Sequence, residues 1–416
     1  MDIKITPSKL SGTVNIPPSK SVAHRLIISA ALAKGTSKIS NIYPSKDIIA
    51  TIEAMKSLGA EISLEGSIAT VKGIENPPKK ATIDCCESGS TMRFLIPVAC
   101  ALGIECTFVG KGKLPQRPIT PYLEEFPKHG IEFDFSNAPQ GCILPCTVKG
   151  KLTPGKFEID GGISSQFITG LIFALTLLDE DSEIILTSHL ESRPYVDITI
   201  DCIKKFGGMI TETESGYLVK GNQTLHASNE ETEGDYSQAA FFKVANSLGS
   251  NINIEGLSSK SSQGDKKIIE ICDKIVYNEN DMLNPFTLDC SDIPDLVPVL
   301  TVLASFCAGK SEIINVARLR IKESDRLEAI SACLNKIGGK VTAYPDKLVI
   351  EGLESLNGGE IESFNDHRIP MAMAMAATRC ENPLVIKGAQ CVEKSYPNFW
   401  EDYRSLGGKI DVINME

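Results

Sequence analysis

The stretch LVPVLTVL, residues 296–303, is apolar on nearly every face of the helix that it predicts. A helix that is apolar all round must be buried on all sides, so we expect sheets to pack around it. A polar turn precedes this run, and similar turns open five other apolar runs along the chain. The six turns begin at residues 19, 88, 164, 235, 291 and 365. This near-regular spacing predicts six copies of one structural unit.

A second repeated element supports the same division. Amphipathic helices end in glycine and run directly into a strand, at Gly59, Gly130, Gly207, Gly338 and Gly407. Glycine just after a helix is its usual stop signal. The long step from Gly207 to Gly338 predicts a degenerate copy near residues 273–275. Each unit then reads as strand, helix, strand, helix, strand, which indicates an α/β protein.

Bulk composition narrows the classes of function. The 416 residues suggest two or three domains, and a formal net charge of −11 argues against a nucleic-acid-binding face. An anionic small molecule stays compatible if cations gather in one place. The N-terminal residues lack a basic-then-apolar signal, and no apolar run reaches the roughly 18 residues of a membrane span. We therefore expect a cytoplasmic protein with no membrane or nucleic-acid partner.

The 13 cysteines are scattered and odd in number, without any Cys-x-x-Cys pair. Cys142 and Cys146 come nearest to a ligand pair, but no second pair or nearby histidine accompanies them. We predict buried free thiols and neither a metal site nor a cofactor.

Cations and carboxylates concentrate at the turns. Helix N-termini carry unpaired N–H groups and a partial positive charge, so they bind anions. Lys20, Ser21 and Arg25 share one helix start, and Arg117 stands between prolines in a loop. Each feature alone also fits a routine cap or a solvated surface charge. Asp295 before the all-apolar helix serves either as a cap or in acid–base chemistry.

In order along the chain, the motifs resemble those of the 5-enolpyruvylshikimate-3-phosphate synthase family. They are PSKS with Arg25, SGSTMR at 88–93, LPQRPI at 114–119, SSQ at 164–166, SRPY at 192–195, IPD at 293–295, KESDR at 322–326, NDHR at 365–368, and Lys394. The resemblance implies a two-domain inside-out α/β barrel with six repeats, three per domain, buried helices and outer sheets. It implies one domain over residues 19–232, a second over 1–18 plus 233–416, and an active site in the cleft between them.

The resemblance also implies roles for individual residues. Shikimate 3-phosphate would be bound by Lys20, Ser21, Arg25, Ser164, Ser165, Gln166, Ser192, Tyr195, Asp295 and Lys322. Phosphoenolpyruvate would be bound by Lys20, Gly89, Arg117, Gln166, Arg326, Arg368 and Lys394. Asp295, Glu323 and Lys20 would be catalytic: Asp295 takes the proton of the 5-hydroxyl, and Glu323 or Lys20 protonates the vinyl carbon. No metal is required, because arginine and lysine neutralise both anions. From the residues themselves, we expect His24 to pack or to orient its neighbours. His367 beside Asp366 fits either a general base or, as we expect, a residue that orients Arg368.

Two positions depart from the family pattern, which often has asparagine where this chain has Glu87 and Arg318. Glu87 would weaken an anion site unless a cation pairs with it, and Arg318 would strengthen one. Gly89 leaves the phosphoenolpyruvate side uncrowded, so we expect inhibition by glyphosate.

Three alternatives stay open. UDP-N-acetylglucosamine enolpyruvyl transferase shares the fold and the enol donor, but it carries Lys-Asn where this chain has Lys20-Ser21, and a cysteine in the loop at 110–119. The others are an RNA-end cyclase built on related repeats and a catalytically inactive anion-binding protein. We expect a monomer whose two domains close when the anionic substrates bind.

Overall fold

The computed structural model describes residues 1–279 and 282–414. The chain divides into two compact units, each with its own core. The inserted unit consists of Pro18–Glu233, and the flanking unit consists of Met1–Pro17 with Gly234–Glu416. The backbone therefore passes from one unit to the other twice.

The inserted unit contains three four-stranded sheets and six α-helices. Their strand orders are β14-β3-β5-β4, β6-β7-β9-β8 and β10-β11-β13-β12. The helices are α1 (Lys20–Leu32), α2 (Lys46–Ser57), α3 (Gly89–Leu102), α4 (Thr120–Glu125), α5 (Ser165–Leu175) and α6 (Arg193–Lys205). The strands are β3 (Thr36–Ser40), β4 (Glu61–Glu65), β5 (Ile68–Lys72), β6 (Lys80–Asp84), β7 (Glu105–Val109), β8 (Glu132–Asp134), β9 (Cys146–Lys149), β10 (Lys156–Ile159), β11 (Ser182–Leu186), β12 (Ile210–Glu212), β13 (Gly216–Val219) and β14 (Glu230–Glu231).

The flanking unit repeats this plan with one reduced sheet. Its sheets are β15-β2, β16-β17-β19-β18 and β20-β21-β1-β22. The helices are α7 (Tyr236–Ser247), α8 (Lys267–Lys274), α9 (Val297–Ala304), α10 (Arg326–Lys336), α11 (Arg368–Ala376) and α12 (Phe399–Ser405). The strands are β1 (Asp2–Thr6), β2 (Ser11–Asn15), β15 (Asn251–Glu255), β16 (Thr287–Asp289), β17 (Lys310–Ile314), β18 (Lys340–Ala343), β19 (Lys347–Glu351), β20 (Gly359–Glu362), β21 (Leu384–Lys387) and β22 (Lys409–Asn414).

Each four-stranded sheet has the same pairing. The first two strands are parallel, the third is antiparallel to the second, and the last two form an antiparallel pair, as in β16 to β19. A helix joins the first two strands in four of these five sheets; the exception is the pair of β14 and β3, which come from opposite ends of the inserted segment. In the copy expected near residues 273–275, α8 ends at Lys274. Isolated bridges then pair Tyr277 with Leu283 and Leu283 with Cys307 before β16 begins. Residues 280 and 281 lie outside the described residues.

The two passages of the backbone explain why distant strands pair. β14, at the end of the inserted segment, lies parallel to β3, and β2 from the N-terminal segment lies parallel to β15. β1 completes the last sheet between β21 and β22. Thus three of the six repeats include a strand that comes from a remote part of the sequence.

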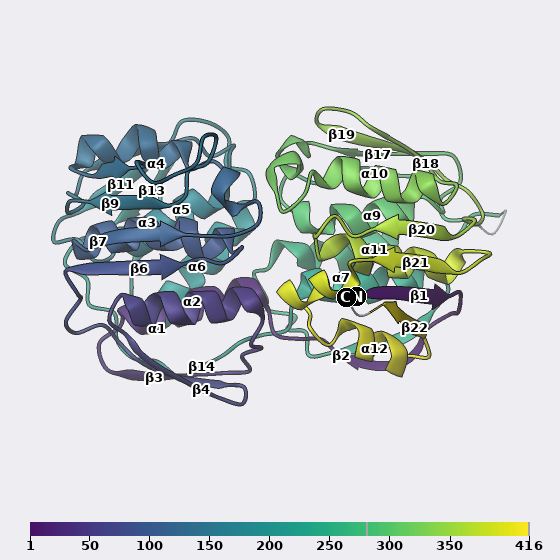
Figure 1. Cartoon of the computed structure of the whole chain (residues 1–416), viewed down its shortest axis with the longest axis horizontal. Helices are drawn as coiled ribbons and strands as arrows, with labels where there is room; N and C mark the ends of the chain where they lie inside the picture. Colours follow the sequence, from purple (N-terminus) through teal and green to yellow (C-terminus); the bar gives the residue numbers. More distant parts are fainter. Residues whose placement is uncertain (280–281, 415–416) are drawn as a thin grey trace. The chain divides into compact units, whose positions relative to one another are not determined.

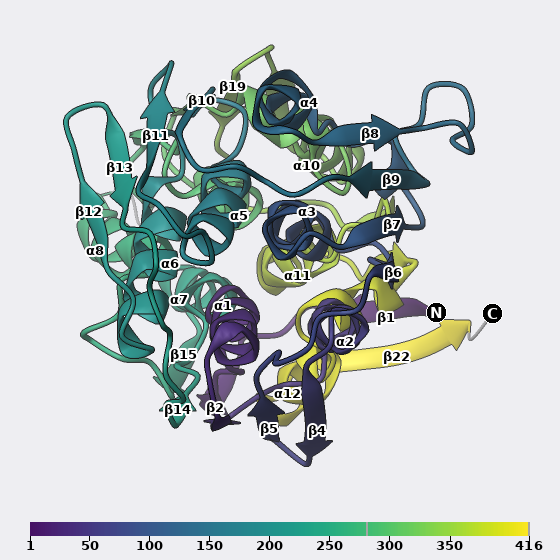
Figure 2. The same cartoon turned by 90° about the vertical axis from the view of Figure 1, so that its left-hand side faces the viewer.

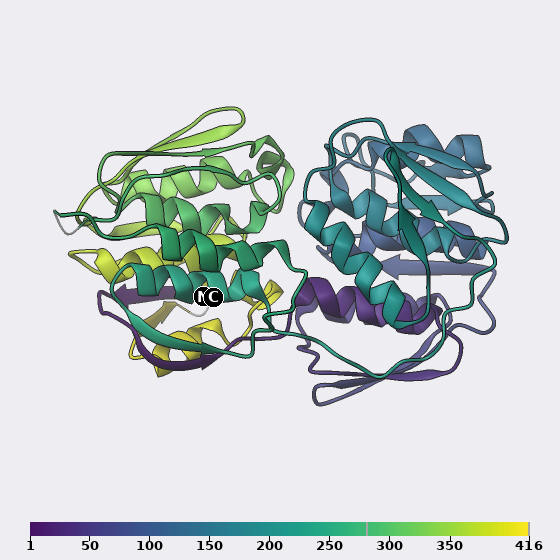
Figure 3. The ribbon, with the colours of Figure 1, turned by 180° about the vertical axis from the view of Figure 1, so that it is seen from behind.

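In each unit the turn-opened helices lie inside and the sheets lie outside (Figures 1 and 2). Every residue of α9 is buried, as its all-apolar sequence requires. Seen from behind, the ribbon shows the same layering within each unit (Figure 3). The predicted inside-out α/β architecture with buried helices and outer sheets is confirmed.

Four of the six turns begin their helix with a side-chain cap. Ser19, Ser88, Ser164 and Asp235 each accept a hydrogen bond from a backbone N–H of the first turn. The other two turns differ. The 3-10 helix η4 (Pro294–Leu296) precedes α9, and Asn365 has a left-handed φ of 53°, unlike an extended capping residue. There Asp366 Oδ1 accepts from the Arg368 N–H at 3.0 Å.

Candidate active site

The start of α1 gathers two cations in the inserted unit. Lys20 Nζ lies 2.9 Å from Asp47 Oδ2 of α2. Arg25 is buried; its Nη1 donates to the Ser21 carbonyl at 2.7 Å and its Nε donates to Thr199 Oγ1 at 2.7 Å. Burial lowers the pKa of Arg25 to about 10, which leaves the guanidinium charged at neutral pH. The prediction that Lys20, Ser21 and Arg25 lie together at this helix start is confirmed.

The Gly89 turn is closed by an arginine. A Cβ atom built on Gly89 would lie 2.6 Å from Arg117 Nη1, so the guanidinium packs directly on the bare backbone. Arg117 follows the 3-10 helix η1 (Leu114–Gln116) and is only 7% exposed. The absence of a side chain at position 89 is what allows this approach.

Gln166 is oriented by Arg93, a residue for which no role in the site was predicted from the sequence. Arg93 Nη1 donates to Gln166 Oε1 at 2.9 Å, and Gln166 Nε2 donates to Ser90 Oγ at 3.0 Å. Arg93 Nη2 also donates to the Pro118 carbonyl at 3.0 Å, next to Arg117. Position 93 stood in a quoted motif, but nothing in the sequence indicated where its side chain points.

The remaining predicted residues of this unit lie at the starts of α5 and α6, two helices in contact. Ser164 caps α5 by accepting from the Gln166 N–H at 3.3 Å, and Ser165 is its first residue. Ser192 precedes α6 with a left-handed φ of 57°, and Tyr195 lies in the first turn. Such a backbone conformation is uncommon for serine and is concentrated at functional sites.

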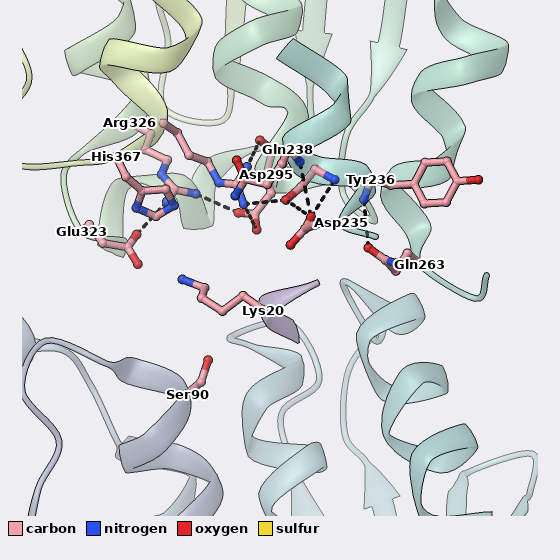
Figure 4. A network of polar contacts seen from close by, with 12 residues as sticks. Lys20, Ser90, Asp235, Tyr236, Gln238, Gln263, Asp295, Glu323, Arg326 and His367 are labelled. Atoms are coloured by element: carbon pink, nitrogen blue, oxygen red, sulfur yellow. Dashed lines mark hydrogen bonds and ion pairs between the residues drawn. The ribbon is translucent and has the colours of Figure 1, made fainter. Parts of the chain in front are cut away.

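In the flanking unit, Asp295 joins two buried arginines (Figure 4). Its Oδ1 lies 2.9 Å from Arg326 Nη1, and its Oδ2 lies 2.8 Å from Arg368 Nη2. Burial by itself raises the pKa of Asp295, but the guanidinium groups of Arg368 and Arg326 outweigh it and hold the pKa well below its usual range. Asp295 is therefore ionised at neutral pH.

Arg326 forms ion pairs with two further carboxylates. Its Nε lies 2.8 Å from Asp366 Oδ2, and its Nη2 lies 2.8 Å from Glu323 Oε2. Burial lowers the pKa of Arg326, but Asp366, Glu323 and Asp295 more than offset it and raise the pKa above its usual range. Ser324 Oγ also donates to Asp366 Oδ2 at 3.1 Å. This arginine is fixed in place by charge-assisted hydrogen bonds.

Lys322 is the lysine of this cluster, and its pKa is strongly shifted. Burial lowers its pKa to about 7; Arg318 and Arg326 push in the same direction, whereas Asp295 and Glu323 oppose them. Arg318 lies in the 3-10 helix η5 (Ala317–Ile321) and donates to the Ser291 carbonyl. Arg318, which stands where the family often has asparagine, is thus a cation that helps to lower the pKa of Lys322.

Lys394 Nζ donates to the Asn365 carbonyl at 2.8 Å, beside the start of α11. His367 is buried, with Nδ1 3.9 Å from Asp366 Oδ1. The Glu87 carboxylate packs on Gly112, where a Cβ atom would lie 2.8 Å from its Oε2. Among residues 1–279 and 282–414, no cluster of histidine, cysteine, aspartate or glutamate has the arrangement of a metal site.

The predicted residues form two sets, one in each unit. Most lie at the starts of helices, whereas Arg117, Lys322 and Lys394 lie at the ends of 3-10 helices. Buried guanidinium groups, an ionised carboxylate between them and a lysine that titrates near neutrality define a protein that binds small polyanions and moves protons. No helix within the described residues has the length and apolarity to cross a membrane.

Comparison with known proteins gives the family. The sequence profile of EPSP synthase (3-phosphoshikimate 1-carboxyvinyltransferase) matches residues 5–403. The chain is 49% identical to a 3-phosphoshikimate 1-carboxyvinyltransferase of Clostridium kluyveri, over 98% of each chain. It is 45% identical to the protein of that name from Clostridioides difficile, over 99% of each.

Solved structures agree in fold. EPSP synthase from Acinetobacter baumannii superposes with a TM-score of 0.82 at 24% identity, covering 99% of this chain and 100% of the other. The enolpyruvyl transferase NikO from Streptomyces tendae gives a TM-score of 0.77 at 15% identity, covering 99% and 98%. The chain belongs to the EPSP synthase family, as its motifs predicted.

Proposed function

We infer that this chain transfers the enolpyruvyl group of phosphoenolpyruvate to the 5-hydroxyl of shikimate 3-phosphate and releases phosphate. The activity belongs to the shikimate pathway, which leads to chorismate and the aromatic amino acids. The observation that carries the inference is Asp295 held between Arg326 and Arg368, with Lys322 and Glu323 beside it. This set combines fixed cations for an anionic donor with groups that exchange protons.

Phosphoenolpyruvate is an anion at both its phosphate and its carboxylate. We assign its binding to Arg326, Arg368 and Lys394 of the flanking unit, and to Lys20, Gly89, Arg117 and Gln166 of the inserted unit. Arginine suits this task because its planar fork donates two parallel hydrogen bonds to a carboxylate or phosphate. The bare Gly89 backbone leaves the Arg117 guanidinium room to lie flat against the turn.

We assign shikimate 3-phosphate to Ser21, Arg25, Ser164, Ser165, Gln166, Ser192 and Tyr195, with Lys20, Lys322 and Asp295. Arg25 supplies a fixed charge for the 3-phosphate, because its bonds to Thr199 and the Ser21 carbonyl hold it in one orientation. Serine hydroxyls and N–H groups at the starts of α5 and α6 complete a polar surface that accepts phosphate and ring hydroxyls.

The titration of the cluster refines the proton chemistry. The resemblance to the family assigned the 5-hydroxyl proton to Asp295, whose two ion pairs with arginines make it a weak base. Lys322, with a pKa of about 7, is better matched to accept that proton, while Asp295 accepts a hydrogen bond. Glu323 or Lys20 protonates the vinyl carbon while the 5-oxygen bonds to the carbon that carries the phosphate, which gives a tetrahedral ketal. The bond from that carbon to the phosphate oxygen then breaks and phosphate leaves toward the fixed cations. An acid–base group of the cluster takes a proton from the new methyl group, which restores the double bond.

The test is phosphate release from phosphoenolpyruvate, measured with shikimate 3-phosphate in one reaction and UDP-N-acetylglucosamine in another. We expect release only with shikimate 3-phosphate. Release only with the UDP-sugar would assign the chain to the other acceptor, and silence in both would indicate a non-catalytic anion binder.

The two residue sets lie in different units, so we propose that they act together in a cleft between two domains of three repeats each, residues 19–232 and 1–18 plus 233–416. We also propose a monomer that closes on its substrates, and small-angle scattering with and without both of them tests this. A cytoplasmic location accords with the thirteen free cysteines, because reducing compartments keep thiols free. Cell fractionation checks it.

A further inference from the structure

The turn Asp235-Tyr236-Ser237 opens the fourth repeat and has no part in the substrate scheme above. Its serine nevertheless contacts an arginine of that scheme. Arg368 Nη2 lies 2.8 Å from Asp295 Oδ2 and donates to Ser237 Oγ at 3.1 Å. Nη2 carries two hydrogens, so Asp295 and Ser237 together hold this end of the guanidinium.

The hydroxyl of Ser237 is turned so that its oxygen faces the arginine. Ser237 Oγ donates to Asp235 Oδ1 at 2.6 Å, and the Ser237 N–H donates to the same oxygen at 2.9 Å. A hydroxyl has one proton to donate, and in Ser237 that proton is used in the hydrogen bond to Asp235. The lone pairs of Ser237 Oγ are therefore left to accept from Arg368.

The turn itself is braced from both sides by Gln263, which is 7% exposed (Figure 4). Gln263 Oε1 accepts from the Tyr236 N–H at 3.1 Å, and Gln263 Nε2 donates to the Gly234 carbonyl at 2.9 Å. The Asp235 N–H donates to the Pro17 carbonyl at 3.0 Å. A Cβ atom on Gly234 would lie 2.3 Å from the Gly256 carbonyl oxygen, so the two backbone segments pack directly against each other there.

We propose that Ser237 is a positioning residue for Arg368, held by Asp235 and braced through Gln263, and that it sets the affinity for phosphoenolpyruvate. The inference rests on the proposed function of Arg368. Asp295 is charged and belongs to the acid–base cluster, so the strength of its ion pair with Arg368 changes whenever the cluster gains or loses a proton. Ser237 is neutral, and its acceptor lone pairs hold the guanidinium through those changes.

The test is steady-state kinetics of Ser237→Ala with both substrates varied in turn. Loss of one hydrogen bond to a charged group corresponds to a rise of about tenfold in KM for phosphoenolpyruvate. We expect the KM for shikimate 3-phosphate to stay within about twofold. Gln263→Met should shift the same constant in the same direction by a smaller factor. Equal shifts in both KM values, or none, would overturn the proposal.

Two controls separate positioning from general damage. Gln223→Met removes a glutamine that braces the Met209 and Lys220 backbone of the inserted unit in the same way, and should leave both KM values unchanged. In an Arg368→Ala background, Ser237→Ala should add nothing, because its partner is already gone. Additive losses there would show a merely structural role and reject the inference.

A binding measurement keeps this result apart from the fate of the proposed function. Phosphate release by the unaltered chain decides the function. The thermal shift that phosphoenolpyruvate alone gives needs no turnover, and it should shrink in Ser237→Ala relative to the unaltered chain. An undiminished shift would refute the role of Ser237 whether or not the chain is a transferase.

Discussion

Replacing Asp295 by asparagine should separate anion binding from turnover. In the structure its carboxylate lies 2.9 Å from Arg326 and 2.8 Å from Arg368, the guanidinium groups assigned to phosphoenolpyruvate. The carboxylate and an incoming anion therefore compete for the same donors. The substitution keeps the shape of the side chain and removes the competing charge.

The size of the effect follows from the two ion pairs. At an effective dielectric of about 20, charges about 4 Å apart attract by about 4 kcal/mol. Desolvation offsets much of this, and Arg326 keeps Asp366 and Glu323 as partners. We therefore expect the Kd for phosphoenolpyruvate to fall about tenfold, or about 1.4 kcal/mol. We expect kcat to fall about tenfold as well, because asparagine accepts the hydrogen bond of the 5-hydroxyl without the charge of the carboxylate.

Isothermal titration with phosphoenolpyruvate measures the first quantity, and phosphate release measures the second. The unliganded variant should melt at a lower temperature and recover when inorganic phosphate is added, since a buried guanidinium has lost a partner. Asp325→Asn is the matched control, because Asp325 caps α10 and pairs with Arg320 in the same unit. It should leave the affinity unchanged. A weaker affinity in Asp295→Asn would refute the competition that we infer.

Three further outcomes are expected. Gly89→Ala places a Cβ atom 2.6 Å from Arg117 Nη1, so the guanidinium group must move. The KM for phosphoenolpyruvate should then rise, while the KM for shikimate 3-phosphate stays constant. A KM for phosphoenolpyruvate equal to that of the unaltered chain would show that Arg117 does not bind this substrate. Lys322 must lose its proton to act as a base, so kcat/KM should fall as the pH drops below about 7. Arg318→Asn removes a nearby cation and raises the pKa of Lys322, so the acidic limb of the pH profile should move to higher pH. An acidic limb that does not move would exclude Lys322 as the base. Glyphosate should inhibit phosphate release, and a titration without effect at millimolar levels would contradict the view that the Gly89 side is uncrowded.

The sequence predicted the local features well because they depend on neighbouring residues. Apolar runs predict the inner helices, and the capping serines at positions 19, 88 and 164 mark where three of them begin, without any tertiary contact. The exceptions are instructive. Asn365 stands at the predicted turn, but its left-handed φ takes it out of the capping role, and Asp366 serves there.

Side-chain partners were beyond the sequence because they join residues far apart in the chain. His24 was expected to orient or pack. Its Nδ1 lies 2.7 Å from Thr51 Oγ1, which lies 2.7 Å from Thr91 Oγ1, so three helices share one buried chain of hydrogen bonds. Burial, with Lys20 and Arg25 nearby, holds the pKa of His24 well below its usual value. No spacing rule connects positions 24, 51 and 91.

The sequence by itself determined the repeated α/β plan, the buried helices and the kinds of residue at their starts, because periodicity and capping act within a few residues. Only the tertiary structure decided how those residues share their charges. Asp295 lies between Arg326 and Arg368, Ser237 faces Arg368, and burial brings the pKa of Lys322 to about 7. Electrostatic coupling depends on distance and burial, which the fold sets by bringing separate repeats together.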